Sequence, residues 1–202
     1  MGALWIWLGA AALYAAFRAW YDNWRGRLRP EEIERFLAAL PAMPGAEGTD
    51  AETMRRFLET DDGREFYMLN LVRLAEGAVP HPQTGAPTRP ATLVREYIRG
   101  FVSVLVRHAG HPALQAPKVG GYVDAWNVAP DPGWGFVGMM RYRSRRDMIE
   151  LASDPRFLAA HPFKIAAIPV TASFPTQPGF VLVLGPRVWV ALVLAIVAAL
   201  LT

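Results

Sequence analysis

The chain has 202 residues, a formal net charge of +3 and no cysteine. This length suits one domain with appendages. The missing cysteines exclude disulfides, thiolate nucleophiles and Cys-ligated zinc or iron–sulfur sites. Apolar residues make up 52% of the sequence and charged residues only 19%. The apolar excess is concentrated at the two ends, and the mild basic charge does not indicate nucleic acid as a partner.

The first apolar segment covers residues 2–21 and is followed by a run of arginines. A helix of about 20 residues spans a bilayer core, and this segment reaches that length if Arg18 extends its side chain toward the head groups. Trp5 and Trp20 lie near its two ends, as aromatic belts do. No Lys or Arg precedes the run, which favours an uncleaved anchor over a cleaved signal peptide.

The last segment, residues 180–202, is also apolar. Residues 188–201 contain no polar side chain and so offer no solvent-facing side for a surface helix. This favours a membrane span or half-span that starts after Pro186 and Arg187. The preceding residues, Phe180–Gly185, either enter the interface or continue as a strand.

The charges beside the two apolar segments predict an orientation. Arg25, Arg27 and Arg29 follow the first segment, and Arg187 precedes the second. Because basic flanks favour the cytoplasmic side, we expect a bacterial inner-membrane protein whose middle domain is cytoplasmic and whose termini are both periplasmic. Membrane lipid is then an expected partner.

The middle of the chain begins with two predicted helices. Residues 30–40 form an amphipathic helix with proline at a favoured first position. A linker follows, and Thr49 with Glu52 is a capping-box pattern that opens a second helix. Asp62-Gly63 then turns the chain into the strand REFYMLNLVRL, residues 64–74.

The remaining elements follow in alternation. Residues 75–90 are a loop, and residues 91–110 form a helix that stops near Gly110. Two strands, residues 120–130 and 133–144, are joined by the turn at residues 130–133. Helices follow at residues 145–152 and from Asp154-Pro155, with a bend or interruption at His161-Pro162. Residues 169–176 are a final strand at a sheet edge, because prolines flank it.

This order predicts an α+β fold, the ferredoxin-like βαββαβ sandwich, with a terminal membrane helix at each end. One sheet face carries both helices, and the other needs a partner. We expect an N-terminal transmembrane helix in residues 1–24 and an amphipathic helix with a linker in residues 25–48. The ferredoxin-like domain covers residues 49–178, and a C-terminal transmembrane or half-spanning segment covers residues 179–202.

Several stretches resemble a bacterial family of unknown function in the dimeric α/β-barrel superfamily. They are FLETDDGREFYMLNLVRL, the helix ending RHAG, and RYRSRRDMIELASDPRF followed by a histidine, within residues 53–175. The piece MLNLVR is the most distinctive. The resemblance implies a homodimer through the open sheet face. The superfamily includes cofactor-free monooxygenases, small-ring isomerases, haem proteins and members with no known activity, so it does not fix a reaction. The two apolar segments and residues 30–48 depart from the small soluble family members and suggest a membrane-complex subunit.

Asn70 and Arg73 stand out because they interrupt an apolar strand. Alternation places Asn70 on one face with Met68, and Arg73 on the other. A buried Asn needs hydrogen bonds, so Asn70 either bonds to neighbouring backbone or lines a ligand pocket. We expect Arg73 to pair with Glu96 or another acid.

The histidines give weaker signals. His108 and His111 have H-x-x-H spacing, but zinc needs three or more ligands, so no metal and no cofactor are expected. His108 is a candidate base or pocket residue, with capping as the alternative. The resemblance makes His161 a haem-ligand candidate, against a plain helix-end role. We expect His81 to be solvated.

Aromatic and basic residues complete the candidates. Tyr97, Trp126 and Tyr142 either line a pocket or pack in the core. The arginine cluster, residues 141–146, is a solvated rim or contacts anionic lipid or an acidic partner. Residues 133–138 fit G-x-G-x-x-G, but they lead into a strand and not a helix, so a dinucleotide site is rejected.

The sequence therefore favours a membrane-anchored binding or accessory subunit. The alternative is a cofactor-free enzyme, of the monooxygenase or isomerase type, acting on an apolar small molecule. In it, Asn70, Tyr97 and His108 would polarise or deprotonate the substrate. A haem protein is the third hypothesis.

Overall fold

The computed structural model describes residues 2–179 and 185–202. The chain forms two compact units, one made of Met1–Arg25 with Pro178–Thr202 and the other of Gly26–Gln177. The first unit holds helices α1 (Gly2–Tyr21) and α7 (Pro186–Leu200). The sequence left open whether Phe180–Gly185 enters the membrane interface or continues as a strand. Residues 180–184 of this segment lie outside the described residues.

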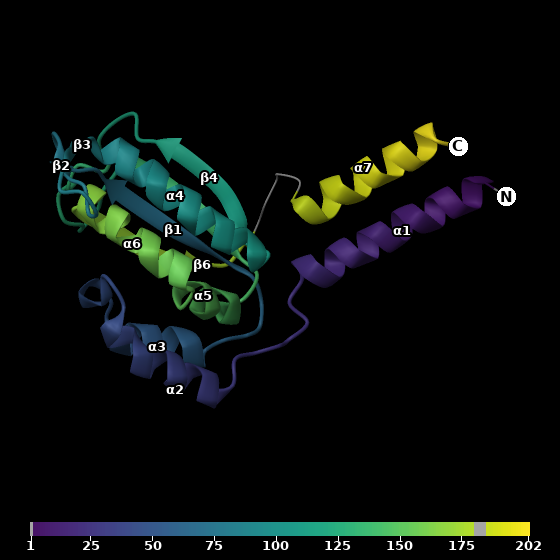
Figure 1. The fold of residues 1–202 in the computed structure, drawn as a ribbon, viewed down its shortest axis with the longest axis horizontal. Helices are drawn as coiled ribbons and strands as arrows, with labels where there is room; N and C mark the ends of the chain where they lie inside the picture. Colours follow the sequence, from purple (N-terminus) through teal and green to yellow (C-terminus); the bar gives the residue numbers. More distant parts are fainter. Residues whose placement is uncertain (1, 180–184) are drawn as a thin grey trace. The chain divides into compact units, whose positions relative to one another are not determined.

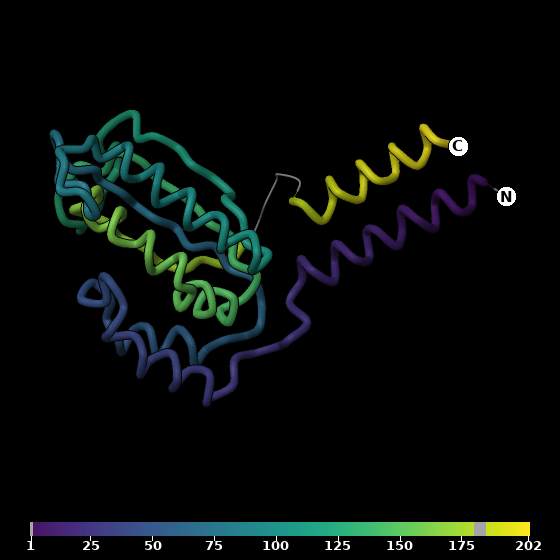
Figure 2. The backbone as a smooth tube through the Cα atoms, in the orientation of Figure 1, coloured from purple at the N-terminus to yellow at the C-terminus, as the bar shows by residue number. Residues whose placement is uncertain are grey.

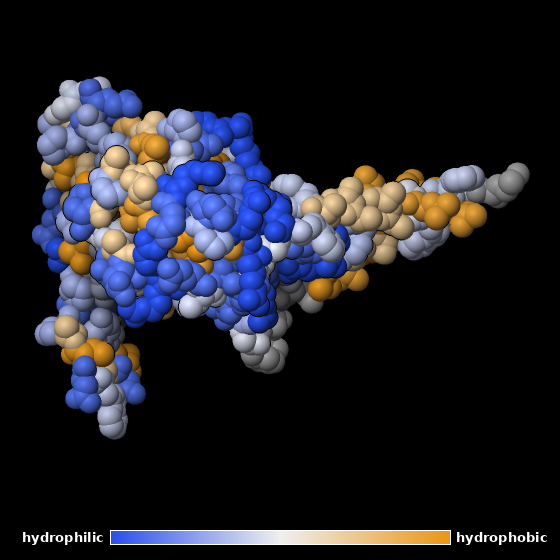
Figure 3. Space-filling model, turned by 90° about the horizontal axis from the view of Figure 1, so that it is seen from below, coloured by the Kyte–Doolittle hydropathy of each residue, from blue (hydrophilic) through white to orange (hydrophobic). Residues whose placement is uncertain are grey.

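Helices α1 and α7 pack against each other as an antiparallel pair (Figures 1 and 2). The hydroxyl of Tyr14 donates to the carbonyl of Arg187 at 3.0 Å, and the Arg187 guanidinium donates to Asp22 at 2.7 Å. The start of α7 thus meets the last turns of α1. Both helices expose apolar side chains, visible in Figure 3 as tan and orange surface.

Only α1, among the described residues, is long and apolar enough to cross a membrane by length and composition. A signal sequence near the N-terminus has the same properties. Helix α7 is apolar but has 15 residues. At 1.5 Å per residue it extends about 22 Å, less than the ~30 Å bilayer core.

The second unit contains the predicted ferredoxin-like fold. Its four-stranded sheet has the order β4-β5-β1-β6, and all neighbours are antiparallel. The strands are β1 (Phe66–Arg73), β4 (His111–Pro117), β5 (Phe136–Tyr142) and β6 (Val170–Thr176). Helix α4 (Pro90–Arg107) joins β1 to β4, and helices α5 (Arg145–Ala152) and α6 (Pro155–Ala167) join β5 to β6. The chain order is therefore βαββαβ, with β6 at an edge as expected.

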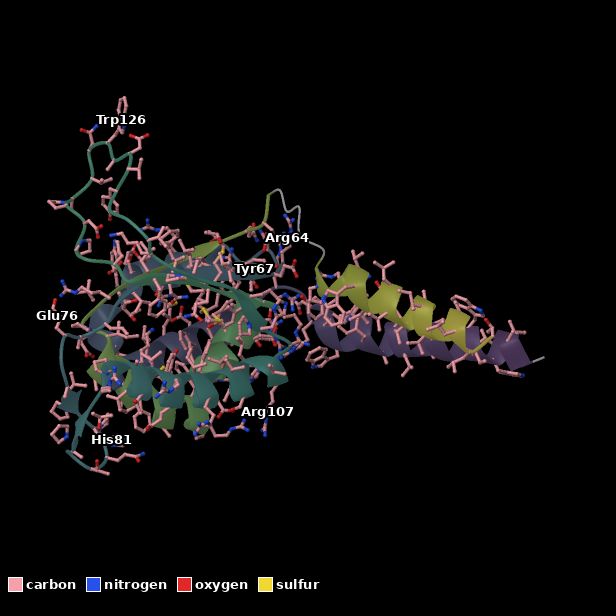
Figure 4. The ribbon with its side chains drawn as sticks, turned by 90° about the horizontal axis from the view of Figure 1, so that it is seen from above. Arg64, Tyr67, Glu76, His81, Arg107 and Trp126 are labelled. Atoms are coloured by element: carbon pink, nitrogen blue, oxygen red, sulfur yellow. The ribbon has the colours of Figure 1, made fainter. Side chains whose placement is uncertain are left out.

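One predicted strand was wrong. The second strand of the fold is His111–Pro117, and residues 120–130 form no strand but belong to a long loop before β5. Two prolines and a register shift between Pro112 and Leu114 obscure the alternation of β4 in the sequence. Figure 4 shows Trp126 at the tip of the loop, which stands away from the sheet.

Helices α4 and α6 cover one face of the sheet and pack closely against each other. A Cβ added at Gly100 would lie 2.7 Å from the Cβ of Ala160, so the missing side chain lets the helices approach. The buried apolar residues beneath them include Phe66, Leu93, Phe101, Val104, Leu105, Leu151 and Phe163. The opposite face carries Tyr67, Leu69 and Leu71, and Tyr67 points away from the two helices in Figure 4.

The segment before β1 adds two helices to this unit, α2 (Pro30–Ala39) and α3 (Ala51–Glu59). Short 3₁₀ turns at Leu40–Ala42 and Ala46–Gly48 separate them. The cap of α3 differs from the predicted Thr49. Asp50 is the N-cap, and its carboxylate accepts from the Thr53 N–H at 2.8 Å.

Three features of the later helices were tested by the structure. Ser144 caps α5 at its start by accepting from the Asp147 N–H at 3.1 Å, where a helix over residues 145–152 was expected. A new helix starts at Pro155, also as expected. The interruption at His161-Pro162 was wrong, because α6 continues through Pro162. Proline removes one N–H, and the packing of α6 on α4 outweighs that loss.

Prolines occupy both edges of the sheet. The edge strand β4 contains Pro112 and Pro117, and the edge strand β6 contains Pro175. A small separate hairpin, β2 (Val79–Pro80) with β3 (Pro87–Thr88), lies in the predicted loop between β1 and α4.

Candidate functional site

A cavity of about 660 Å³ lies between the sheet and its helices. Its floor is formed by one face of the two central strands, where β1 contributes Met68 and Asn70 and β5 contributes Gly138 and Met140. Met68 pairs with Met140, and Asn70 pairs with Gly138. Alternation along each strand places these residues on the helix side. Gly138 has no side chain, which leaves room above the sheet centre.

Helices α4 and α6 form the cavity wall. Residues of α4 that recur every three or four positions face inward, namely Val94, Tyr97, Ile98 and Phe101. From α6, Phe157 and Lys164 lie two turns apart on the same side and also line the cavity. The lining is mainly apolar, as is typical of small-molecule sites.

Asn70 lines the cavity and is also held by the sheet. Its amide nitrogen donates to the carbonyls of Met68 at 3.0 Å and Gly138 at 3.3 Å. Its amide oxygen accepts from the Ser173 hydroxyl at 2.8 Å. The hydrogen bonds therefore join β1, β5 and β6. They supply the structural role that the sequence allowed, and the position in the cavity keeps the ligand role open.

Two tyrosines face the cavity. Burial raises the pKa of the Tyr97 phenol far above its usual value, and Tyr142 adds to the effect. Burial also raises the pKa of Tyr142. Both phenols are therefore neutral near pH 7 and can donate hydrogen bonds, but neither is a base.

Lys164 is the cavity residue that sequence reasoning missed. Its ammonium lies 5.9 Å from the centre of the Tyr97 ring, and desolvation lowers its pKa. Among the described residues, no acid forms an ion pair with it. The sequence signal was its spacing from Phe157 and Ile168, which places a lysine on the apolar side of α6.

His108 lies outside the cavity lining. It is the C-cap of α4, and its Nδ1 is 3.5 Å from the Glu150 carboxylate and 3.7 Å from that of Asp147. These ligand atoms lie within 4.8 Å of one another, close enough for a cation. However, Asp147 already accepts from Arg143 at 2.5 Å and 3.0 Å and from Ser144. The arrangement is that of an ion network joining α4 to α5.

Asp147 titrates as a member of this network. Burial opposes its ionisation, but hydrogen bonds from His108, Arg143 and Ser144 outweigh burial and hold the pKa of its carboxyl well below the usual range. The carboxylate is therefore charged and bound to protein donors.

The other predicted ligand residues do not reach the cavity either. His161 packs against Phe157 and Tyr97, with ring centres 5.0 Å and 6.3 Å apart. Desolvation, with the nearby charge of Lys164, lowers its pKa to about 4. Trp126 is exposed at the loop tip. Thus Asn70, Tyr97 and Tyr142 come together, whereas His108, His161 and Trp126 lie elsewhere.

The arginine cluster was expected at a solvated rim or against lipid, and this was wrong. Arg141 is fully buried, and its guanidinium bonds Glu65 at 2.6 Å and 3.1 Å. Arg146 is 3% exposed and binds Glu32 at 2.9 Å. The hydrogen bonds from Arg146 lower the pKa of Glu32 to about 2.

The remaining two arginines of the cluster also bind within the unit. Arg143 pairs with Asp147, as described, and Arg145 lies 3.6 Å from Asp61. Arg145 also donates to the carbonyl of Phe57, at the end of α3. Together with the Arg146–Glu32 pair, this contact fastens α2 and α3 to the sheet layer.

Two further expectations about single residues were wrong. Arg73 donates to the carbonyl of Pro132 at 2.7 Å and does not pair with Glu96. Glu96 instead lies 3.3 Å from His81. His81 is not solvated, since it also packs against Phe163 with ring centres 5.4 Å apart. The glycine motif, residues 133–138, leads into β5 and not into a helix, as the sequence predicted.

The strand order β4-β5-β1-β6 and the βαββαβ chain order define the ferredoxin-like α+β fold. No family model and no curated protein matches the chain. Among solved structures, the protein RPA0582 of unknown function from Rhodopseudomonas palustris has 25% identity and a TM-score of 0.53, covering 66% of this chain and 96% of its own. The methylated form of RPA0582 has 24% identity and a TM-score of 0.52, covering 68% of this chain and 94% of its own.

A weaker similarity is to SnoaB, a cofactor-independent oxygenase from Streptomyces nogalater. It has 13% identity and a TM-score of 0.38, covering 59% of this chain and 97% of its own. Similarity at this level carries no inference about activity here.

Proposed function

We propose that the protein is a membrane-anchored binding subunit that holds an apolar small molecule in the cavity of its α/β unit. The observation that carries this is the cavity itself, which has about 660 Å³ and a mainly apolar lining. Sites for small organic ligands typically have 300–1,000 Å³ and a few polar groups among apolar walls. The apolar pair α1 and α7 supports the anchor.

An enzyme is the second candidate, and the geometry favours it less. Asn70 and Tyr97 line the cavity, but His108, the expected base, does not. Tyr97 is a hydrogen-bond donor with a raised pKa. The neutral polar groups of the lining can therefore polarise a ligand, and among the described lining residues Lys164, whose pKa is lowered, is the group that could take a proton. A haem site receives no support from His161, which packs outside the lining.

The proposal can be tested with a variant whose new side chain fills the cavity. Gly138→Leu would project a side chain from β5 into it, since only the end of Met140 lies within 4.0 Å of the added Cβ. Gly120→Leu is the matched control, because Gly120 has open space around it. Native mass spectrometry of full-length protein released from mild detergent would measure retention of methyl dodecanoate. We expect at least tenfold weaker retention in Gly138→Leu only. Equal retention in both variants would contradict the proposal.

We also propose that two copies pair through the open sheet face. Leu69 and Leu71 of β1 lie on that face, and Phe174 of β6 is opposite Leu69 and 45% exposed. An apolar sheet face without a covering layer needs a partner. Leu69→Lys should give a monomer by native mass spectrometry, whereas Val106→Lys on exposed α4 surface should leave the dimer intact. A dimer in both variants would contradict this interface.

A further inference from the structure

The charged residues of the cavity are all basic. Lys164 lines it from α6, and Arg95 and Arg99 line it from α4, whereas no Asp or Glu occurs among the lining residues that the structure describes. The other polar groups of the lining are neutral and include Asn70 and Tyr97. A cavity that is otherwise apolar thus presents positive charge only.

The three basic residues differ in their surroundings. Arg95 and Arg99 are exposed, and Arg95 donates to the Thr92 hydroxyl at 3.1 Å. Their charges are therefore hydrated and screened. Lys164 is half-buried, and the described residues give it the Tyr97 ring but no carboxylate. Lys164 is therefore the least exposed of the three basic residues of the lining.

The other lysine of the chain, Lys118, has the ion pair with an acid that is usual for a lysine. Lys118 forms an ion pair with Asp131 in the loop before β5. In the described part of the chain Lys164 has no equivalent partner, although burying an unpaired ammonium is costly. A ligand that brings its own negative charge into the cavity would supply the missing partner. Burial of that pair in low dielectric would make the pairing strong.

We infer that Lys164 is the anchor for a carboxylate, and that the ligand is an amphiphilic acid with an apolar body and one carboxylate group. The apolar body would lie along Met68, Met140 and Phe101, and the carboxylate would meet the Lys164 ammonium beside Tyr97. This inference rests on the proposed function and names its ligand class. Desolvation lowers the pKa of the Lys164 amine, and a bound carboxylate would oppose that effect by favouring the charged form.

The experiment compares one ligand body with and without its charge. Native mass spectrometry of the full-length protein in mild detergent would measure dodecanoic acid against methyl dodecanoate. In the wild type we expect the acid to bind at least tenfold more tightly. In Lys164→Met we expect the acid to lose this advantage while the ester binds as before. Lys164→Arg should keep most of the preference, and Lys118→Met is the control that should change neither affinity.

Each result separates the two proposals. Equal binding of acid and ester by the wild type would overturn the carboxylate anchor and leave the apolar site standing. A preference that persists unchanged in Lys164→Met would overturn the role of Lys164. Binding of neither compound would overturn the proposed function as well. The wild-type comparison needs no variant, so it holds even if a substitution prevents folding.

Discussion

The buried pair of Arg141 and Glu65 gives the sharpest test of the stability reasoning. Arg141 is 0% exposed, and its guanidinium donates to Glu65 at 2.6 Å and 3.1 Å and to the Ala109 carbonyl at 2.5 Å. Ala109 has a positive φ of 54°, so this hydrogen bond also fixes the turn between α4 and β4. Arg141→Met would remove all of these bonds while keeping much of the side-chain volume.

The expected cost follows from the exposure of the partner left behind. Removing one member of a buried ion pair costs about 3–5 kcal/mol. The Glu65 side chain is 21% exposed, so water can reach its carboxylate after Arg141 is removed. We therefore expect the lower end, about 3 kcal/mol of unfolding free energy. Glu65→Leu is the reverse case and leaves a fully buried guanidinium with the Ala109 carbonyl. It should cost more, about 4–5 kcal/mol.

Urea unfolding of the full-length protein in mild detergent, followed by far-ultraviolet circular dichroism, measures both costs. Equal m-values would show that the variants change stability and not the unfolded state. The double variant should cost less than the sum of the two single changes, because neither charge is then left without the other. If Arg141→Met costs under about 1 kcal/mol, or if Glu65→Leu is the milder change, the assignment of buried pairing is refuted.

Three further outcomes are expected in the same unfolding assay. Asp50→Ala should cost about 1 kcal/mol because the Thr53 N–H loses its cap, and no loss would contradict the cap. Gly100→Ala should destabilise by about 1–2 kcal/mol because the new Cβ meets Ala160, and Gly100→Ala with Ala160→Gly should recover most of the loss. His161 has a pKa of about 4 in the folded protein, below its value of about 6.5 in the unfolded chain. The unfolded chain therefore binds more protons between about pH 6.5 and 4, and the stability of the fold decreases as the pH falls through that window. His161→Leu should remove about 1–2 kcal/mol of that loss, a figure reduced because the ring is partly solvated, and an unchanged pH profile would contradict it.

The order of helices and strands could be predicted because each element has a clear period. In β1, Met68 and Asn70 alternate with Leu69 and Leu71, so the strand and both its faces were correct. In β4, Pro112 and the register shift destroy the alternation, while the apolar residues of 119–128 imitate it. Strand pairing with β5 selects the true strand, and pairing over such a distance is not visible in local sequence.

The candidate site was only partly predictable for a similar reason. Asn70 was identified because it interrupts an apolar strand, and Tyr97 because it is an aromatic residue that either lines a pocket or packs in the core. Lys164 was missed because a single lysine in a helix usually faces solvent. Arg145 and Arg146 were misread because their partners Asp61 and Glu32 lie more than eighty residues earlier in the chain. Only the tertiary fold brings these charges together.

The prolines at both edges of the sheet restrict how copies can join. Pro112 and Pro117 in β4 and Pro175 in β6 offer no N–H to an incoming strand. Growth of the sheet into a continuous ribbon of many chains is therefore discouraged at either side. A membrane confines anchored proteins to two dimensions, where collisions between neighbours are frequent. For the membrane-anchored pair proposed above, these edges would oppose the joining of sheets from many copies and so protect against fibrous aggregation.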